Sequence, residues 1–322
     1  MKIGSIKSAL AATAIALALP GAAAAEYPEK EVQLVIPFGP GGATDVLFRL
    51  ISAEAEKHFG ESIVPINMAG AGATRGSREV KDAKPDGYTI LGSHDTIALS
   101  KLAGMVDYSY DAFEPVILLT QTVLVISAGP DPVVSSAAEI GAYAAEHPGE
   151  LKFSMIPSST DHFFWVSFFE GAGIDMGNIR LIGYPDTGEQ VSAVLAGDID
   201  FGAFNMPSAG SQYKAGTLTA LAAASEERLG ALPEVPTLME QDIPVTSATS
   251  RGIFVPKGTP QEVIDALGDA YEAALQNEEL VSRIENEFGS NVNIKRGADY
   301  VAFLEQNEAA LAKAAENIDF SR

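Results

Sequence analysis

Close to its N-terminus the chain carries the stretch Leu34-Val35-Ile36-Pro37-Phe38-Gly39-Pro40-Gly41-Gly42-Ala43-Thr44-Asp45. Its apolar first part is typical of a strand that is buried on both faces of a parallel sheet. The glycines that follow let the backbone turn sharply and approach a ligand without interference from Cβ atoms. Apolar residues recur at helical spacing over residues 46–51, so a helix is predicted to begin near Thr44 and Asp45, which are suitable capping residues.

The start of this helix is a candidate anion site. Its free N–H groups and the positive end of its dipole point at whatever occupies the turn. We therefore expect Phe38, Gly41, Gly42 and Thr44 to contact the ligand, mainly through the backbone. Asp45 is either a cap that braces the turn or an acceptor for a ligand amino group. The same order of elements also describes many nucleotide-binding units, so the rest of the chain must decide.

Residues 1–25 are typical of a secretory signal peptide. Two lysines precede an apolar run over residues 9–19, and three alanines precede Glu26. The apolar run is too short to cross a membrane. We expect cleavage after Ala25 and a soluble protein that is exported to a bacterial periplasm, with no membrane anchor.

The composition excludes several kinds of partner. The chain has 43 acidic and 21 basic residues, for a formal net charge of −22. Nucleic acid and anionic lipid are therefore unsuitable partners, whereas a recessed site can still be positive enough for a small anion. Cysteine is absent and only four histidines are present, so we expect neither disulfides, nor a metal site, nor a cofactor.

Strand-like and helical patterns alternate along the whole chain, which predicts an α/β architecture. The predicted strands cover residues 32–38, 63–66, 88–92, 116–119, 122–127, 151–155, 179–183, 200–204, 218–223 and 252–255. The predicted helices cover residues 45–58, 74–82, 137–146, 161–170, 188–195, 260–276, 278–288 and 298–317.

Turn-rich segments at residues 130–132 and 246–250 are the predicted domain boundaries. If the chain crosses between domains at both, residues 26–127 and 248–322 form lobe one, and residues 128–247 form lobe two. Two crossovers make a hinge, and closure of the lobes would enclose a ligand between them.

Six motifs follow one another in a recognisable order. They are residues 37–45, Asn67 with residues 70–72, Pro85-Asp86-Gly87-Tyr88-Thr89, residues 195–200, Leu232-Pro233-Glu234-Val235-Pro236-Thr237, and residues 251–260. In this order the chain resembles the Bug-type extracytoplasmic solute receptors, which are the substrate-binding components of tripartite tricarboxylate transporters. The resemblance covers almost all of the chain after residue 25.

The resemblance implies a type II-like periplasmic binding protein with a ligand cleft between two lobes and two crossover hinge strands. It implies a monomer that binds a small carboxylate and delivers it to the membrane permease subunits. The ligand would be a dicarboxylate or tricarboxylate, an acidic amino acid, or an aromatic acid. In such receptors the first two strand–helix loops hold a carboxylate through backbone N–H groups and water, which adds Ala71 and Gly72 to the site. Ala69 and Ala73 depart from the family pattern of proline and glycine.

Polar residues near the ends of other predicted strands complete the candidate site, because open α/β sheets bind ligands at the carboxyl ends of their strands. These residues are Ser93, His94, Ser158, Thr160, His162, Tyr184, Thr187 and Asn205. One of the hydroxyls at residues 158–160 is expected to cap the next helix, and His162 either contacts the ligand or braces its loop. Asp186 is either a solvated loop acid or a partner for a positive ligand group.

Two cations and one aromatic run have an ordinary structural interpretation. Arg75 and Arg78 are near the second loop but are more typical of a solvated helix face than of a ligand anchor. The aromatic residues between Phe163 and Phe169 recur at helical spacing and are expected to lie in the core.

Two other classes of function are alternatives for this sequence. A binding protein of this kind could present its closed form to a membrane sensor kinase instead of a permease. An enzyme is less compatible with the sequence, because the chain lacks the serine-hydrolase elbow, the phosphate-binding loop of nucleotide hydrolases and the paired histidines of zinc peptidases. Asp161-His162 and His94-Asp95 could assist acid–base chemistry, but nothing marks a nucleophile.

Overall fold

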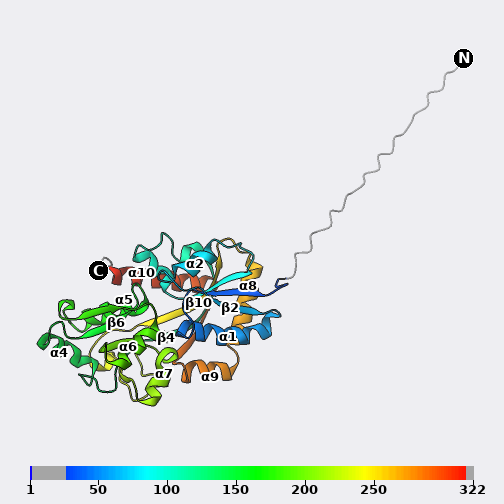
Figure 1. The fold of residues 1–322 in the computed structure, drawn as a ribbon. Coiled ribbons are helices and arrows are strands. Elements are labelled where there is room, and N and C mark those ends of the chain that lie inside the picture. The colour runs from blue at the N-terminus through cyan, green and yellow to red at the C-terminus, as the bar shows by residue number, and fades with distance from the viewer. Residues whose placement is uncertain (2–26, 317–322) are drawn as a thin grey trace.

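The computed structural model describes Met1 and residues 27–316, which fold around two β-sheets (Figure 1). The predicted signal peptide over residues 1–25 lies, apart from Met1, outside the described residues. Helices alternate with strands along the chain, so the predicted α/β class is confirmed. No helix within residues 27–316 is long and apolar enough to cross a membrane.

The first sheet has six strands in the order β11-β4-β10-β3-β1-β2. The parallel strands are β1 (Val32–Ile36), β2 (Ile63–Asn67) and β3 (Thr89–Ser93), and β1 lies between the other two. The next strand, β10 (Ala248–Pro256), is antiparallel to both β3 and β4 (Phe113–Val123). The edge strand β11 (Ser290–Arg296) pairs with β4.

Helices cover both faces of this sheet. One face packs against α1 (Ala43–Phe59), α8 (Gln261–Ala274) and α9 (Glu278–Asn286). The other packs against α2 (Thr74–Lys81), α3 (Thr96–Leu102) and α10 (Gly297–Ala315). Apolar side chains from alternate positions of β1 enter the two cores, as expected of a strand buried on both faces.

The second sheet has five strands in the order β7-β6-β8-β5-β9. They are β5 (Val125–Ala128), β6 (Lys152–Met155), β7 (Arg180–Gly183), β8 (Phe201–Phe204) and β9 (Thr219–Ala223). Its helices are α4 (Ile140–Glu146), α5 (Thr160–Gly171), α6 (Thr187–Ala196) and α7 (Met206–Ala215). Short 3-10 helices occur at Tyr110–Ala112, Ala137–Glu139, Met176–Asn178 and Met239–Gln241.

The aromatic residues of α5 form the centre of the second core. Trp165 is fully buried and packs edge-on against Phe153 of β6, with 4.9 Å between ring centroids. Its indole N–H donates to the carbonyl of Ser154 at 2.8 Å, so its polar atom is also satisfied. The interpretation of this aromatic run as core is therefore confirmed.

The chain crosses between the two sheets twice, and the two crossings run side by side. Leu124 separates β4 from β5, and its carbonyl accepts a hydrogen bond from the N–H of Ala224 at 2.8 Å. The N–H of Ser247, just before β10, donates to the carbonyl of Ala224 at 2.8 Å. Because β5 pairs with β8 and β9, we propose that lobe one ends at Leu124 rather than at residue 127.

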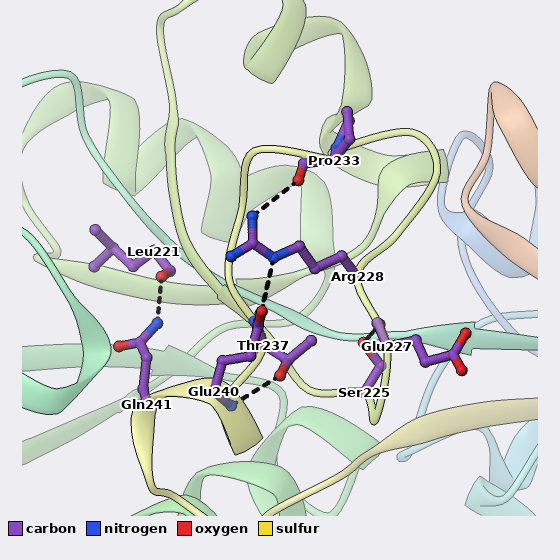
Figure 2. A network of polar contacts seen from close by, with 8 residues as sticks. All are labelled: Leu221, Ser225, Glu227, Arg228, Pro233, Thr237, Glu240 and Gln241. Carbon is purple, nitrogen blue, oxygen red and sulfur yellow. Dashed lines mark hydrogen bonds and ion pairs between the residues drawn. The ribbon is translucent and has the colours of Figure 1, made fainter.

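A polar network holds the segment that leads into the second crossing (Figure 2). Arg228 pairs with Glu240 at 2.9 Å, and the side-chain amide of Gln241 donates to the carbonyl of Leu221 in β9 at 3.0 Å. The motif over residues 232–237 lies inside this network, so it positions a segment beside the hinge.

Candidate functional site

The predicted loops of lobe one meet at one edge of the first sheet. Strands β1, β2 and β3 are parallel, so their carboxyl ends share that edge. Strand β10 is antiparallel to β3, and Gly252 pairs with Ser93, so the beginning of β10 reaches the same edge. Ligands bind at such an edge in open α/β sheets.

The first loop is braced by Asp45. Its carboxylate accepts the N–H of Gly41 at 2.9 Å, the side-chain amide of Asn67 at 2.8 Å and Nε of Arg49 at 2.7 Å. Burial would raise the pKa of Asp45, but these three donors outweigh it and hold the pKa below its ordinary value. Both carboxylate oxygens are engaged inside the loop, which favours the brace among the two roles expected of Asp45.

The beginning of α1 is open toward the sheet edge. Gly42 is its N-cap residue in an extended conformation, with φ −74° and ψ 165°. A Cβ atom built on Gly42 would have only the carbonyl oxygen of Gly39 within reach, at 4.0 Å. The first N–H groups of a helix have no partner within the helix. The site therefore combines helix N–H groups that lack an intrahelical partner with open space at the Gly42 Cβ position.

The second loop turns through four consecutive residues with positive φ, from Gly70 to Ala73. Ala71 has φ 49° and Ala73 has φ 70°, a conformation that costs a residue with a side chain about 1–2 kcal/mol. Thr74 Oγ donates to the carbonyl of Ala71 at 2.7 Å, and Ser100 Oγ donates to the carbonyl of Gly72 at 3.1 Å. The departure from glycine at Ala73 thus leaves the loop strained.

A surface pocket of about 460 Å³ adjoins the second loop. It is lined by Ala69, Gly70, Ala71, Thr74, Arg75, Arg78, Glu79 and Asp82. Both arginines are exposed, as expected of a solvated helix face.

His94 follows β3 and forms a ring pair with Phe38. The two ring centroids are 4.5 Å apart and the rings are nearly parallel, at 10°. The N–H of Thr96 donates to Nδ1 of His94 at 3.3 Å, so a neutral ring carries its proton on Nε2. Burial, with the charge of Arg251, lowers the pKa of His94 well below its usual range. His94 is therefore a neutral donor at neutral pH.

Arg251 was not among the predicted site residues, yet it lies at the centre of this edge. It is only 2% exposed. Its Nε donates to Thr44 Oγ at 3.0 Å, and its Nη1 donates to Thr122 Oγ at 2.6 Å. Burial lowers its pKa to about 10, so the guanidinium keeps its charge at neutral pH. The available signal was a single cation directly before the apolar run over residues 252–255.

The carboxylate of Asp95 acts on the charge of Arg251 by electrostatic attraction. This carboxylate accepts the N–H of Ser250 at 2.8 Å and the side-chain amide of Asn307 in α10 at 2.7 Å. Burial raises the pKa of Asp95 to about 6, although both donors and Arg251 oppose the shift. Within residues 27–316, no ion pair of 4.0 Å or less joins Asp95 to Arg251.

The loop after β6 supplies the nearest part of lobe two. Thr160, the first residue of α5, lies 3.4 Å from Thr249 of β10, measured between hydroxyl oxygens. Ser159, not its two neighbours, is the N-cap residue, but its hydroxyl makes no capping hydrogen bond to the helix. The N–H of Ser158 donates to Nδ1 of His162 at 3.3 Å, so His162 braces the loop, as one of its two expected roles required.

The remaining lobe-two candidates follow β7 and β8. Asn205 caps α7 by accepting the N–H of Ser208 at 3.2 Å, which leaves its amide N–H groups for another partner. Asp186 caps α6 by accepting the N–H of Glu189 at 2.9 Å, and it is exposed. Tyr184 and Thr187 flank Asp186, and they make no hydrogen bond to lobe one within the part of the chain that the structure describes.

The structure thus joins only some of the predicted residues directly. Thr44 hydrogen-bonds Arg251, and His94, which stacks on Phe38, feels the charge of Arg251. Thr160 reaches the same strand from lobe two. Gly41, Gly42, Ala71 and Gly72 lie on the neighbouring loops of lobe one, and Ser93 ends β3. In lobe two, Tyr184 and Asn205 lie between a strand and a helix, whereas His162 and Thr187 are in the first turns of α5 and α6. The hydroxyl of Ser93 is buried and, among the described residues, has no hydrogen-bond partner.

Comparisons with known proteins identify the family of this chain. The sequence profile described as "Tripartite tricarboxylate transporter family receptor" matches residues 47–318. Protein BugT of Bordetella pertussis is 31% identical over 263 residues, which cover 79% of each chain. MatC of Rhodopseudomonas palustris with bound malate has 26% identity and a TM-score of 0.82, over 90% of this chain and 100% of that one.

Two further solved structures are similar over nearly the whole chain. An R. palustris protein with adipate has 26% identity and a TM-score of 0.85, over 91% of this chain and 98% of that one. The periplasmic binding protein BugD has 26% identity and a TM-score of 0.80, over 90% and 98%. These proteins are substrate-binding receptors and not enzymes, and the resemblance inferred from the motifs is confirmed. The chain belongs to the receptor family of the tripartite tricarboxylate transporters, whose Bug-type members are periplasmic binding proteins.

Proposed function

We propose that this protein captures a small carboxylate between its two lobes in the periplasm and delivers it to a membrane permease. The observation that carries the proposal is the open N-terminus of α1. Asp45 fixes the shape of the loop from inside, the space at the Gly42 Cβ position is open, and the first N–H groups of the helix have no partner within it. Such groups bind an anion through hydrogen bonds and the helix dipole.

The ligand is proposed to bind through the first two strand–helix loops. In lobe one the expected contacts are Phe38, Gly41, Gly42, Thr44, Ala71, Gly72, Ser93 and His94. Hydrogen bonds to a charged group each contribute about 1.5–3 kcal/mol. Three or four of them, less the cost of ordering, give a dissociation constant near micromolar, or about −8 kcal/mol.

Lobe two is proposed to select among carboxylates. Its expected contacts are Ser158, Thr160, His162, Tyr184, Thr187 and Asn205, which are hydroxyl, imidazole and amide groups without a positive side chain. Two structural relatives are known with malate and with adipate, both dicarboxylates. We include dicarboxylates, tricarboxylates, acidic amino acids and aromatic acids in the proposed class.

Hinge closure is proposed to enclose the ligand. The two crossings run side by side at Leu124 and Ser247, and Thr160 already contacts Thr249 at the base of the cleft. A pair of adjacent crossings lets two rigid lobes rotate with few backbone changes. The closed monomer would then dock on the permease subunits implied by its family.

The test is thermal unfolding of residues 26–322 with a panel of carboxylates at fixed pH and salt. Ligand that binds only the folded state adds RT ln(1 + [L]/Kd), about 2.7 kcal/mol at a hundredfold excess over Kd. We expect one chemical class, among malate, citrate, adipate, glutamate and phthalate, to raise the unfolding temperature. If none of them raises the unfolding temperature, the proposed function as a carboxylate receptor is wrong.

Delivery needs its own experiment. Vesicles that contain the permease subunits should take up the identified carboxylate only when the receptor is added. Binding without uptake in any permease preparation, together with binding to a sensor kinase, would favour the signalling alternative.

A further inference from the structure

Arg251 is a buried cation whose charge is only partly compensated. It lies at the cleft edge of β10 and is 2% exposed. Its described hydrogen bonds go to neutral oxygens, namely the hydroxyls of Thr44 and Thr122 and the carbonyl of Thr249. No carboxylate within residues 27–316 pairs with it within 4.0 Å.

A buried and unpaired guanidinium lowers the stability of the fold unless a negative partner compensates its charge. Buried charges in proteins are normally paired, because the loss of hydration is several kcal/mol for each ion. Asp95 exerts only a longer-range attraction, since its own oxygens accept from Ser250 and Asn307. Arginine cannot escape the cost by losing its proton at neutral pH.

The position of Arg251 suggests what completes its environment. Its Nε holds Thr44 Oγ, and Thr44 is in the first turn of α1, where the proposed anion site begins. Because Thr44 Oγ accepts from Arg251, its own hydrogen remains for a ligand oxygen. The described hydrogen bonds use Nε and Nη1, which leaves Nη2 for a further acceptor.

We infer that Arg251 binds a carboxylate of the ligand, together with Thr44 and the N-terminus of α1. The inference rests on the proposed function and deepens it, since the ligand is then held by a side-chain cation and not by the backbone alone. The bound carboxylate replaces the missing counter-ion. The ligand class is therefore narrowed to molecules that place an ionised carboxylate at the first loop, and their amides are excluded.

The experiment compares Arg251→Met with the exposed matched control Arg78→Met. The probe is whichever of malate, adipate, glutamate and phthalate wild-type protein binds most tightly, measured by calorimetry. We expect Arg251→Met to weaken binding at least about a hundredfold, equivalent to about 2.8 kcal/mol. Arg78→Met should stay within about threefold of wild type, because Arg78 is solvated on α2.

The ligand-free proteins provide the readout that a merely structural arginine would not give. Replacing an incompletely paired buried charge by an apolar side chain is often neutral or stabilising. We therefore expect ligand-free Arg251→Met to unfold at the same temperature as wild type or higher, while its affinity falls. Unchanged affinity in this variant would overturn the inference and leave the proposed function intact.

A measurement on wild-type protein covers the case in which Arg251→Met does not fold. The Nε–H signal of Arg251 in a ¹⁵N spectrum, assigned with Arg251→Lys, should shift when the probe is added. The carboxamide of the same probe should not bind measurably. A signal that stays in place while calorimetry reports binding would overturn the inference. Absence of binding by citrate as well as by all four probe carboxylates would overturn the proposed function itself.

Discussion

The loops after β1 and β6 are built alike, but they differ in charge. In each, an acid in the first turn of the next helix accepts a backbone N–H from the loop at 2.9 Å, Asp45 from Gly41 and Asp161 from Ile156. Asp45 is further held by a cation, Arg49 at 2.7 Å. Asp161 instead accepts from its own neighbour, His162, and from the neutral side chain of Gln190 at 2.8 Å.

This difference in charge suggests different roles in binding for the two lobes. Lobe one gathers positive charge around its loop, from Arg49 on the outside to Arg251 within. Lobe two offers neutral donors and acceptors, and its bracing acid is buried without a described cation. We infer that lobe one supplies affinity for the carboxylate and that lobe two supplies selection among carboxylates.

The largest effect is expected from Gly42→Val, which should remove the affinity for the carboxylate that we assign to lobe one. The valine side chain would cover the first N–H groups of α1, so binding should be abolished. Folding should persist, because Gly42 has an ordinary negative φ and open space around its Cβ position. Calorimetry with the tightest carboxylate and circular dichroism would measure the two properties.

The counterpart in lobe two is Thr160→Val, at the first residue of α5. It removes one hydroxyl without closing a backbone site, so a loss of no more than about tenfold is expected. Gly230→Val, at an open glycine distant in sequence from both loops, serves as the folding control. Normal binding by folded Gly42→Val would remove the first loop from the site.

The two bracing acids, Asp45 and Asp161, are expected to change the stability of the protein in different pH ranges. Burial raises the pKa of Asp161 to about 6, from an ordinary 3.8. Between these pH values the folded state holds a proton that the unfolded chain has lost, so Asp161 makes the protein more stable as pH falls from 7 to 4. Asp161→Asn should lose about 1–3 kcal/mol of that pH-dependent gain.

Asp45 should behave in the opposite way. Its pKa is lowered, so its stabilising contribution is present above its ordinary value of 3.8 and is lost only as pH falls further. Urea unfolding of wild type, Asp161→Asn and Asp45→Asn between pH 3 and 8 would measure both windows. Asp95, whose pKa is raised to about 6, is present in all three proteins, so its contribution cancels in the differences. Parallel profiles for wild type and Asp161→Asn would contradict the assignment.

Much of the fold could be predicted from local patterns. The apolar run of β1, the glycines after it and the helical spacing of apolar residues in α1 identified a strand–loop–helix unit. The predicted strand over residues 32–38 is two residues longer than β1 (Val32–Ile36). The segment Met206–Ala215 was not predicted as a helix because its proline, serines and glycine suggest a turn. In fact Asn205 caps it, and proline is well suited to the first turn of a helix.

Strands at special places were harder to predict. The edge strand β11 is mostly polar, because it has one neighbour and is partly exposed. Two predicted strands over residues 116–119 and 122–127 divide the chain differently from β4 and β5. The observed break falls at Leu124 because the chain changes sheets there, which no local pattern encodes.

The candidate site was predictable where it follows the order of elements along the chain. Loops after strands identified Thr44, His94 and Thr160, which the structure brings near one another through β10. Arg251 could not be found in this way, because its partner Thr44 is 207 residues distant in the sequence. Its burial depends on how β10 is inserted between β3 and β4, a property of the whole sheet.

The smallest effect is expected from Arg75→Ala. This variant tests the contrast between Arg251, which contacts the first turn of α1, and Arg75, which lies beside the second loop. Arg75 is exposed at the start of α2 and lines the surface pocket, whereas Arg251 is buried. A solvated charge is screened by water and salt, so calorimetry should detect less than about a threefold change in affinity. A loss greater than tenfold would move the recognition of the carboxylate from the first loop to the second. The positive charge that matters would then lie at the surface of lobe one, and the buried cation would be left with a purely structural role.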